Sequence, residues 1–343
     1  MPSRTYALSL ITVMAGLFLA VVSINLIIDP EAVLGTGLLG RSQNPNDRYL
    51  KMRAYLAAPD RYDGVFLASS RGGVVPLDEL SRRMDGATFA DFAVFGGQIV
   101  DHLAVLEYIV GSKAAQGTKL RAVFLLLDAD FFGARIYANR SLQTLWPPAL
   151  SGESSARFVW RYLTAIQFAA WRNQIGYARS GRRPDLPRDG AQPGSTPVGG
   201  PTPRASVATS AASAAAGEIV GNAASGESGE LITTRSDFLP QLALLAEFVK
   251  LCGARGLGLA VALSPLRRTN AMRYNQRDMA EAVERIAAIV PVWDFGSPDW
   301  LSDRPDLWFD DSHFRPEVAK MMLDRMFASD TSAAPKPFGV LRR

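Results

Sequence analysis

The sequence has few of the residues that build disulfides and metal centres. Its 343 residues include one cysteine, Cys252, and two histidines, His102 and His313. A single cysteine cannot form an internal disulfide, and no Cys/His spacing typical of zinc sites is present. Because Cys252 lies in a helical pattern, we expect it to pack in the core. The sequence therefore gives no reason to expect a cofactor.

Concentrated positive charge is also missing. The net charge is only +4, and several arginines lie in a stretch that we do not expect to join the core, at Arg182, Arg183, Arg188 and Arg204. There is no basic stripe with interleaved aromatic residues, which nucleic-acid-binding surfaces carry. We therefore expect no nucleic-acid partner.

Aromatic residues are absent from one long stretch. Residues 181–237 contain no Phe, Trp or Tyr and consist mainly of Pro, Gly, Ser, Thr and Ala. Such a segment cannot bury enough apolar surface to offset its chain entropy. We predict a disordered insertion over 181–235, within a chain whose 48% apolar residues suffice for a large core elsewhere.

Charge is absent from one apolar run near the N-terminus. Ala7 to Ile28 has 22 uncharged residues, enough to cross a hydrocarbon layer of about 30 Å. Arg4 precedes the run, so the positive-inside rule puts residues 1–6 in the cytoplasm and everything after the 7–28 anchor outside it. We therefore expect a single-pass inner-membrane protein with a periplasmic catalytic domain. The alternative is a cleaved signal peptide, with Val21 and Ser23 as the small residues before the cut.

Five short apolar runs, separated mostly by helical patterns, follow a juxtamembrane segment at 29–60. Near-continuous apolarity fits strands buried on both faces of a parallel sheet. Strands alternating with helices favour a three-layer, doubly wound α/β fold with a five-stranded parallel sheet over 61–330. We expect a partly helical insertion at 135–180 and a C-terminal tail at 331–343. The five runs are 62–69, 88–96, 121–129, 257–265 and 290–295.

Chemically useful residues follow the first four of these strands, and two more, Asp310 and His313, lie on the loop before the last helix. A parallel sheet presents its ligands at the carboxyl ends of its strands, so these residues should meet at one edge. A hydroxyl, an imidazole, carboxylates and backbone donors together are what acyl chemistry requires. A metal at Asp128 and Asp130 is the alternative, but no companion ligands accompany them. The residues concerned are Ser69, Ser70, Arg71, Gly96, Gly97, Asp128, Asp130, Arg267, Asp310 and His313.

Three sequence blocks resemble those of SGNH (GDSL-type) hydrolases and acyltransferases. "LASSRGG" is similar to the first block in its Gly-Ser-Ser-Arg variant, "FADFAVFGG" to the second, and "FDDSHF" to the last, Asp-x-x-His. The flanks "NLIIDP", "ALSPLRR" and "VWDF" resemble membrane-anchored members that accompany cell-surface polysaccharide O-acetylation. The resemblance implies a flavodoxin-like sheet. It also implies an O-acyltransferase with a polysaccharide acceptor and a membrane protein as acyl donor.

The same resemblance assigns roles residue by residue. Ser70 aligns with the nucleophile, His313 with the base and Asp310 with the group that orients it, while Ser69 is structural. The backbone N–H groups of Ser70 and of Gly96 or Gly97 would form the oxyanion hole. Substrate contact or support of the site is assigned to Arg71, Asp128, Asp130 and Arg267.

The sequence departs from the family pattern at three places. Ala68 stands where the first block has glycine, Asp128 where the third block has asparagine, and Leu266-Arg267 where anchored members often have histidine. An ionised carboxylate cannot donate to an oxyanion. Two alternatives to transfer therefore stay open: an esterase that uses water as acceptor, and a non-catalytic binding or assembly subunit of a polysaccharide modification or export complex.

Overall fold

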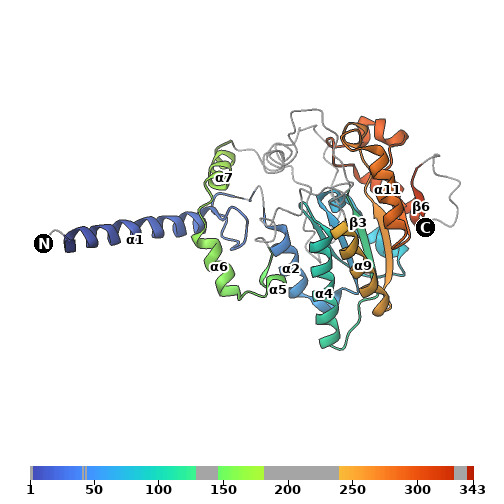
Figure 1. Ribbon diagram of the computed structural model, residues 1–343. Helices are drawn as coiled ribbons and strands as arrows, with labels where there is room; N and C mark the ends of the chain where they lie inside the picture. Colours follow the sequence, from blue (N-terminus) through green and yellow to red (C-terminus); the bar gives the residue numbers. More distant parts are fainter. Residues whose placement is uncertain (1–2, 41, 43–44, 129–145, 181–238, 328–337) are drawn as a thin grey trace, which may run out of the picture. The chain divides into compact units, whose positions relative to one another are not determined.

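The protein is described by a computed structural model covering residues 3–40, 42, 45–128, 146–180, 239–327 and 338–343 (Figure 1). These residues form two compact units. The first contains residues up to Arg53 together with 146–180, and the second contains 54–128 and the described residues from 239 onward. The predicted disordered insertion 181–235 and Asp130 lie outside the described residues.

The second unit is built on a six-stranded sheet in the order β2-β1-β3-β4-β5-β6. The first five strands are parallel, and β6 pairs antiparallel with β5. The order of the five parallel strands is one of the two common doubly wound orders. The strands are β1 (Gly64–Ser69), β2 (Phe89–Val94), β3 (Ala122–Leu127), β4 (Gly258–Leu263), β5 (Val292–Asp294) and β6 (Val340–Arg342).

The α/β class is confirmed, but the prediction of an all-parallel, five-stranded sheet was wrong. The sheet is mixed, because residues 340–342 of the predicted tail form β6 at its edge. This strand is only three residues long and ends in arginine. A segment that short cannot show the alternation by which a strand is recognised.

Helices cover both faces of the sheet. On one face α3 (Leu77–Arg83) contacts α12 (Pro316–Phe327), and their side chains share a core cluster with Phe66 and Phe124 of the sheet. Successive side chains of a strand point to opposite faces, so Val65 and Leu67 face the other helical layer. There α4 (Ile99–Ala115) contacts α9 (Leu239–Ala254), and α11 (Gln276–Ala287) contacts β5. All six residues of β1 are buried, which explains its uninterrupted apolar run.

The first unit is organised around one long helix. This helix, α1 (Ser3–Ile28), is long and apolar enough over Arg4–Ile28 to cross a membrane. The described part of the predicted insertion 135–180 contains helices, and two of them, α6 (Ser155–Thr164) and α7 (Phe168–Ser180), contact α1. The remaining elements are α2 (Asp47–Ala57), α5 (Pro148–Ser151), α10 (Arg268–Ala271) and the 3₁₀ turns η1 (Pro59–Arg61), η2 (Ser70–Val74), η6 (Trp300–Asp303) and η7 (Pro305–Leu307).

Candidate active site

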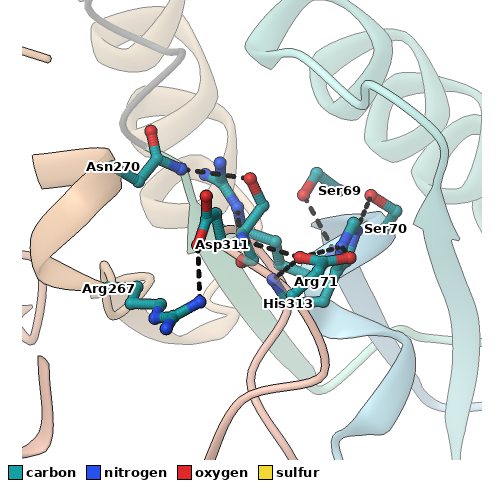
Figure 2. Close-up of polar contacts among 9 residues, drawn as sticks. Ser69, Ser70, Arg71, Arg267, Asn270, Asp311 and His313 are labelled. Atoms are coloured by element: carbon teal, nitrogen blue, oxygen red, sulfur yellow. Dashed lines mark hydrogen bonds and ion pairs between the residues drawn. The ribbon is translucent and has the colours of Figure 1, made fainter. Parts of the chain in front are cut away.

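The two adjacent serines at the end of β1 have different environments. Ser69 is buried, and its Oγ accepts a hydrogen bond of 3.2 Å from the Arg71 N–H, which caps the 3₁₀ turn η2. Ser70 begins that turn and is only half-buried. The strand-to-turn junction therefore uses the first hydroxyl for structure and leaves the second at the surface of the sheet edge (Figure 2).

This junction is tightly packed. A Cβ on Gly72 would lie 2.3 Å from the Cβ of Ala68, so the turn requires glycine at position 72. Ala68 itself lies inside β1 and is not among the described residues with positive φ. Alanine costs little in extended backbone, so its presence where the family has glycine does not distort the strand.

Ser70, His313 and Asp310 form a continuous hydrogen-bonded chain. The Ser70 Oγ lies 3.1 Å from Nε2 of His313, although the two residues are 243 positions apart. On the other side of the ring, Nδ1 lies 2.9 Å from Oδ2 of Asp310. A carboxylate can only accept, so Nδ1 carries the hydrogen and Nε2 keeps its lone pair for the serine proton.

Asp310 is ionised at neutral pH. Burial raises its pKa, but the hydrogen bond and charge of His313 and the backbone N–H groups of Ser312 and His313 outweigh this and lower it from 3.8 to about 2. Those two N–H groups donate to Oδ1 over 2.7 and 2.8 Å. The carboxylate can therefore hold the ring in one orientation and stabilise an imidazolium when one forms.

The loop that carries Asp310 and His313 is closed by its own backbone and by a buried aromatic pair. The Phe309 N–H donates to the His313 carbonyl over 2.8 Å, and Trp308 and Phe314 form an isolated antiparallel bridge. The rings of Trp308 and Phe314 are buried and meet edge to face at 6.3 Å. Phe309, by contrast, is 52% exposed. The bridge fixes the spacing of the acid and the histidine.

Arg71 binds this loop through its backbone, and Asp128 pairs with Arg71. The Nε of Arg71 donates to the Ser312 carbonyl over 3.1 Å, and its Nη1 lies 3.5 Å from Oδ2 of Asp128. Asp128 directly follows β3, which pairs with β1, so the sheet order brings the two side chains together. Both side chains are more than nine-tenths buried, which suits support of the site better than contact with a substrate.

The predicted oxyanion glycines lie beside Ser70. Ser69 and Val94 are partners in the register of β1 and β2, so residues 96 and 97 follow next to Ser70. Gly96 has a φ of 56°, a conformation that glycine adopts without strain. The Gly97 N–H donates to the Val94 carbonyl over 2.9 Å, and a Cβ at this position would lie 2.7 Å from the Ala68 carbonyl oxygen. Gly97 is thus required for close packing against β1, and its role toward an oxyanion stays a prediction.

The residues after β4 hold the same loop from the side. Arg267 pairs with Asp311 at 2.5 Å, and the Asn270 side chain donates to the Ser312 Oγ over 3.1 Å (Figure 2). Asn270, Asp311 and Ser312 were not predicted from the sequence. Their contacts span more than 40 positions, so the sequence does not show which residues pair. The one hint for Asn270 is the polar run that follows the fourth apolar strand.

Two further features of the described residues bear on the chemistry. Among them no group of three or more His, Cys, Asp or Glu side chains could hold a metal ion. A cavity lies at the ends of β4 and β5, lined by Leu263, Ser264, Met279, Asp294 and Ser297 among others, and none of its lining residues belongs to the Ser70–His313–Asp310 chain. The candidate active site is therefore the hydrogen-bonded group of Ser70, His313 and Asp310.

Comparison with known proteins adds no assignment. No protein-family model matches this chain, and no curated protein matches it. The geometry around Ser70 and the resemblance of the sequence blocks are therefore the two guides to what this protein does.

Proposed function

We propose that this protein is a serine-dependent acyl-transfer enzyme of the SGNH type. The observation that carries the proposal is the hydrogen-bonded chain from the Ser70 hydroxyl through His313 to an ionised Asp310. The doubly wound order of the parallel strands and the location of the chain at their carboxyl ends support the same assignment.

The reaction follows from the roles that the atoms can take. The Ser70 Oγ attacks an acyl carbonyl carbon while Nε2 of His313 takes its proton. The tetrahedral adduct collapses to an acyl-Ser70 ester, and the imidazolium gives the proton to the departing alcohol or thiol. An acceptor hydroxyl then loses its proton to Nε2 and attacks the acyl carbon. When this second adduct collapses, the acyl group leaves with the acceptor and the imidazolium returns the proton to the Ser70 Oγ, which restores the free serine. The Ser70 N–H and a glycine N–H from positions 96–97 would stabilise each oxyanion.

We propose a polysaccharide hydroxyl as the acceptor and acetyl as the acyl group. The proposal draws on the resemblance to anchored polysaccharide O-acetyltransferases and on α1, which could hold the enzyme at the inner membrane with its second unit in the periplasm. An exposed aromatic ring adjoins the triad at Phe309, and sugar faces stack on such rings. A membrane protein would supply the acyl donor.

Hydrolysis is the second candidate. The His313 side chain is 35% exposed, so water can reach the position of the acceptor hydroxyl. An esterase would use the same three residues and the same acyl-enzyme.

The test is an assay of the full-length protein in nanodiscs with a chromogenic acetyl ester, with and without an oligosaccharide acceptor. Transfer predicts an acetylated oligosaccharide and faster release of the chromophore when the acceptor is present. Hydrolysis predicts that the chromophore is released at the same rate with and without the oligosaccharide acceptor. Both must vanish in Ser70→Ala. If the wild type and Ser70→Ala are equally silent while Ser70→Ala still disrupts polysaccharide acetylation in cells, the protein acts as a binding or assembly subunit instead.

A further inference from the structure

The C-terminal end of α1 is locked to the connection between α6 and α7. Asn25 is fully buried, and its side-chain N–H groups donate to the carbonyls of Leu163 and Ala165 over 2.9 and 2.8 Å. Its Oδ1 accepts a 2.7 Å hydrogen bond from the Trp171 indole. An amide inside an otherwise apolar helix is costly unless its groups are paired, and here the α6–α7 connection pairs them.

One side of α6 is used within its own unit. Phe158 and Tyr162 are buried in a small cluster with Val33, and the Tyr162 hydroxyl donates to Oδ1 of Asp29 over 2.8 Å. Together with the Asn25 contacts, this fixes α6 and α7 as two arms that run to either side of the end of α1 (Figure 1).

A set of large apolar side chains on these arms and on the connection between them stays exposed. Trp160 is 58% exposed, Ile166 62% and Phe168 73%. Single exposed apolar residues are ordinary, but these three fall within nine positions, beside the point where α1 ends. The Trp160 ring also lies 5.6 Å from the ring of Phe18, which belongs to the apolar span. The exposed apolar surface of α1 is therefore continuous with that of α6.

The depth of this surface follows from the length of the span. Arg4 and Asn25 are 21 positions apart, or about 32 Å at 1.5 Å per residue, which matches a hydrocarbon layer of about 30 Å. If Arg4 marks one boundary, Asn25 marks the other, and the connection that binds Asn25 lies at that boundary. Tryptophan favours this depth, and the exposed Arg157 and Arg172 on the same helices suit lipid phosphates.

We propose that α6 and α7 form an interfacial collar (residues 155–180) that lies in the headgroup region of the leaflet where α1 emerges, with Trp160, Ile166 and Phe168 inserted toward the acyl chains. The occupant of this surface is the bilayer itself. The inference depends on α1 spanning the membrane. It goes beyond the proposed function, because it assigns a lipid contact to the insertion between the third and fourth strands.

The experiment measures how deeply single labelled positions lie in the bilayer. The full-length protein, with Cys252→Ala as background, receives one cysteine at Ile166 or Phe168, is labelled with an environment-sensitive fluorophore and is placed in phosphatidylethanolamine/phosphatidylglycerol nanodiscs. Leu17→Cys in α1 serves as the membrane reference and Lys320→Cys, exposed on α12, as the aqueous reference. Quenching by lipids that carry a shallow spin label is compared with quenching by iodide. Ile166 is the main position because its side chain has no ring contact to lose.

The collar predicts that the shallow spin-labelled lipid quenches labels at 166 and 168 more strongly than the label at 17, which lies about 12 Å deeper in the bilayer. Iodide should quench them several-fold less than the label at 320. If iodide quenches the labels at 166 and 168 as strongly as the label at 320, while the spin-labelled lipid still quenches the label at 17, the collar is refuted and α1 remains the membrane anchor. Protection from both quenchers would place these side chains against protein and equally overturn it. Iodide quenching at 17 would overturn the anchor and the collar together.

Discussion

Removing the Asp128 carboxylate should unfold the second unit at a clearly lower temperature. Asp128→Ala leaves the Arg71 guanidinium, which is only 6% exposed, without its carboxylate partner. Breaking a buried ion pair from one side costs about 3–5 kcal/mol. The distance of 3.5 Å is longer than a strong charge-assisted hydrogen bond, so we expect the lower end, about 3 kcal/mol. For a domain of this size that is a fall of about 6–12 °C in Tm.

The exposed pair on the other side of the same loop provides a matched control. Arg267 and Asp311 are 31% and 66% exposed and lie 2.5 Å apart. Exposed pairs contribute about 0–1 kcal/mol, so Asp311→Ala should lower Tm by less than about 4 °C. Both variants lose a carboxylate that pairs with an arginine near His313, and they differ mainly in burial.

The assay is a thermal melt of the full-length protein in detergent at one scan rate, followed by tryptophan fluorescence. Arg71 also donates a hydrogen bond to the Ser312 carbonyl. Asp128→Ala should therefore also slow the covalent labelling of Ser70 by a serine-directed phosphonate, measured at a temperature where the variant is still folded. If Asp128→Ala lowers Tm no more than Asp311→Ala does, and Ser70 is labelled at the normal rate, the Arg71–Asp128 pair does not support the site. Arg71 would then have to be reconsidered as a substrate contact.

Three further predictions test other parts of the structure. The pKa of Asp310 is lowered to about 2, so the interactions of its carboxylate should stabilise the fold above about pH 4 and lose that effect as pH falls toward 2. In Asp310→Asn, the free energy of unfolding measured with urea should therefore change less with pH in this window. In Gly97→Ala the new Cβ would lie 2.7 Å from the Ala68 carbonyl oxygen, so this variant should have a lower Tm and a lower rate of phosphonate labelling at Ser70. The control Gly73→Ala, which has open space around its Cβ, should change neither. Equal effects of the two substitutions would show that Gly97 is not needed for packing. A reporter fused after Arg343 should be active only outside the cytoplasm, and cytoplasmic activity would overturn the predicted orientation.

The strands and the meeting of distant polar residues could be predicted because both follow from local patterns. Each of the five parallel strands lies within one of the apolar runs, since burial on both faces leaves few polar positions inside it. The carboxyl-edge rule then places Ser70 at the edge where ligands bind. His313 lies well after β5, on the loop before α12, and this loop brings it to the same edge. The family blocks added which of the two serines faces the histidine, and the structure has Ser70 there.

The contacts that hold the loop carrying Asp310 and His313 could not be predicted in the same way. The Arg71 side chain reaches a backbone carbonyl 241 positions away, and a carbonyl has no sequence signature. Asn270 and Ser312 meet through short polar side chains whose pairing depends on the length of the loop after β4. The packing of α6 and α7 on α1 likewise depends on Asn25, one of a few polar residues in an uncharged, mainly apolar run. Such contacts are set by the tertiary fold.

The most direct test of the central claim is to identify the residue that a serine-directed phosphonate labels. Intact-mass and peptide mass spectrometry on the full-length protein should show one adduct, on Ser70. Ser70→Ala and His313→Ala should abolish it, with a loss in any turnover of about 10⁴- to 10⁶-fold, and Asp310→Asn should cost less than Ser70→Ala. Ser69→Ala should keep the adduct, because its hydroxyl caps the turn rather than facing His313. An adduct that persists in Ser70→Ala, or a folded wild type that never reacts, would contradict the assignment of Ser70 as the nucleophile.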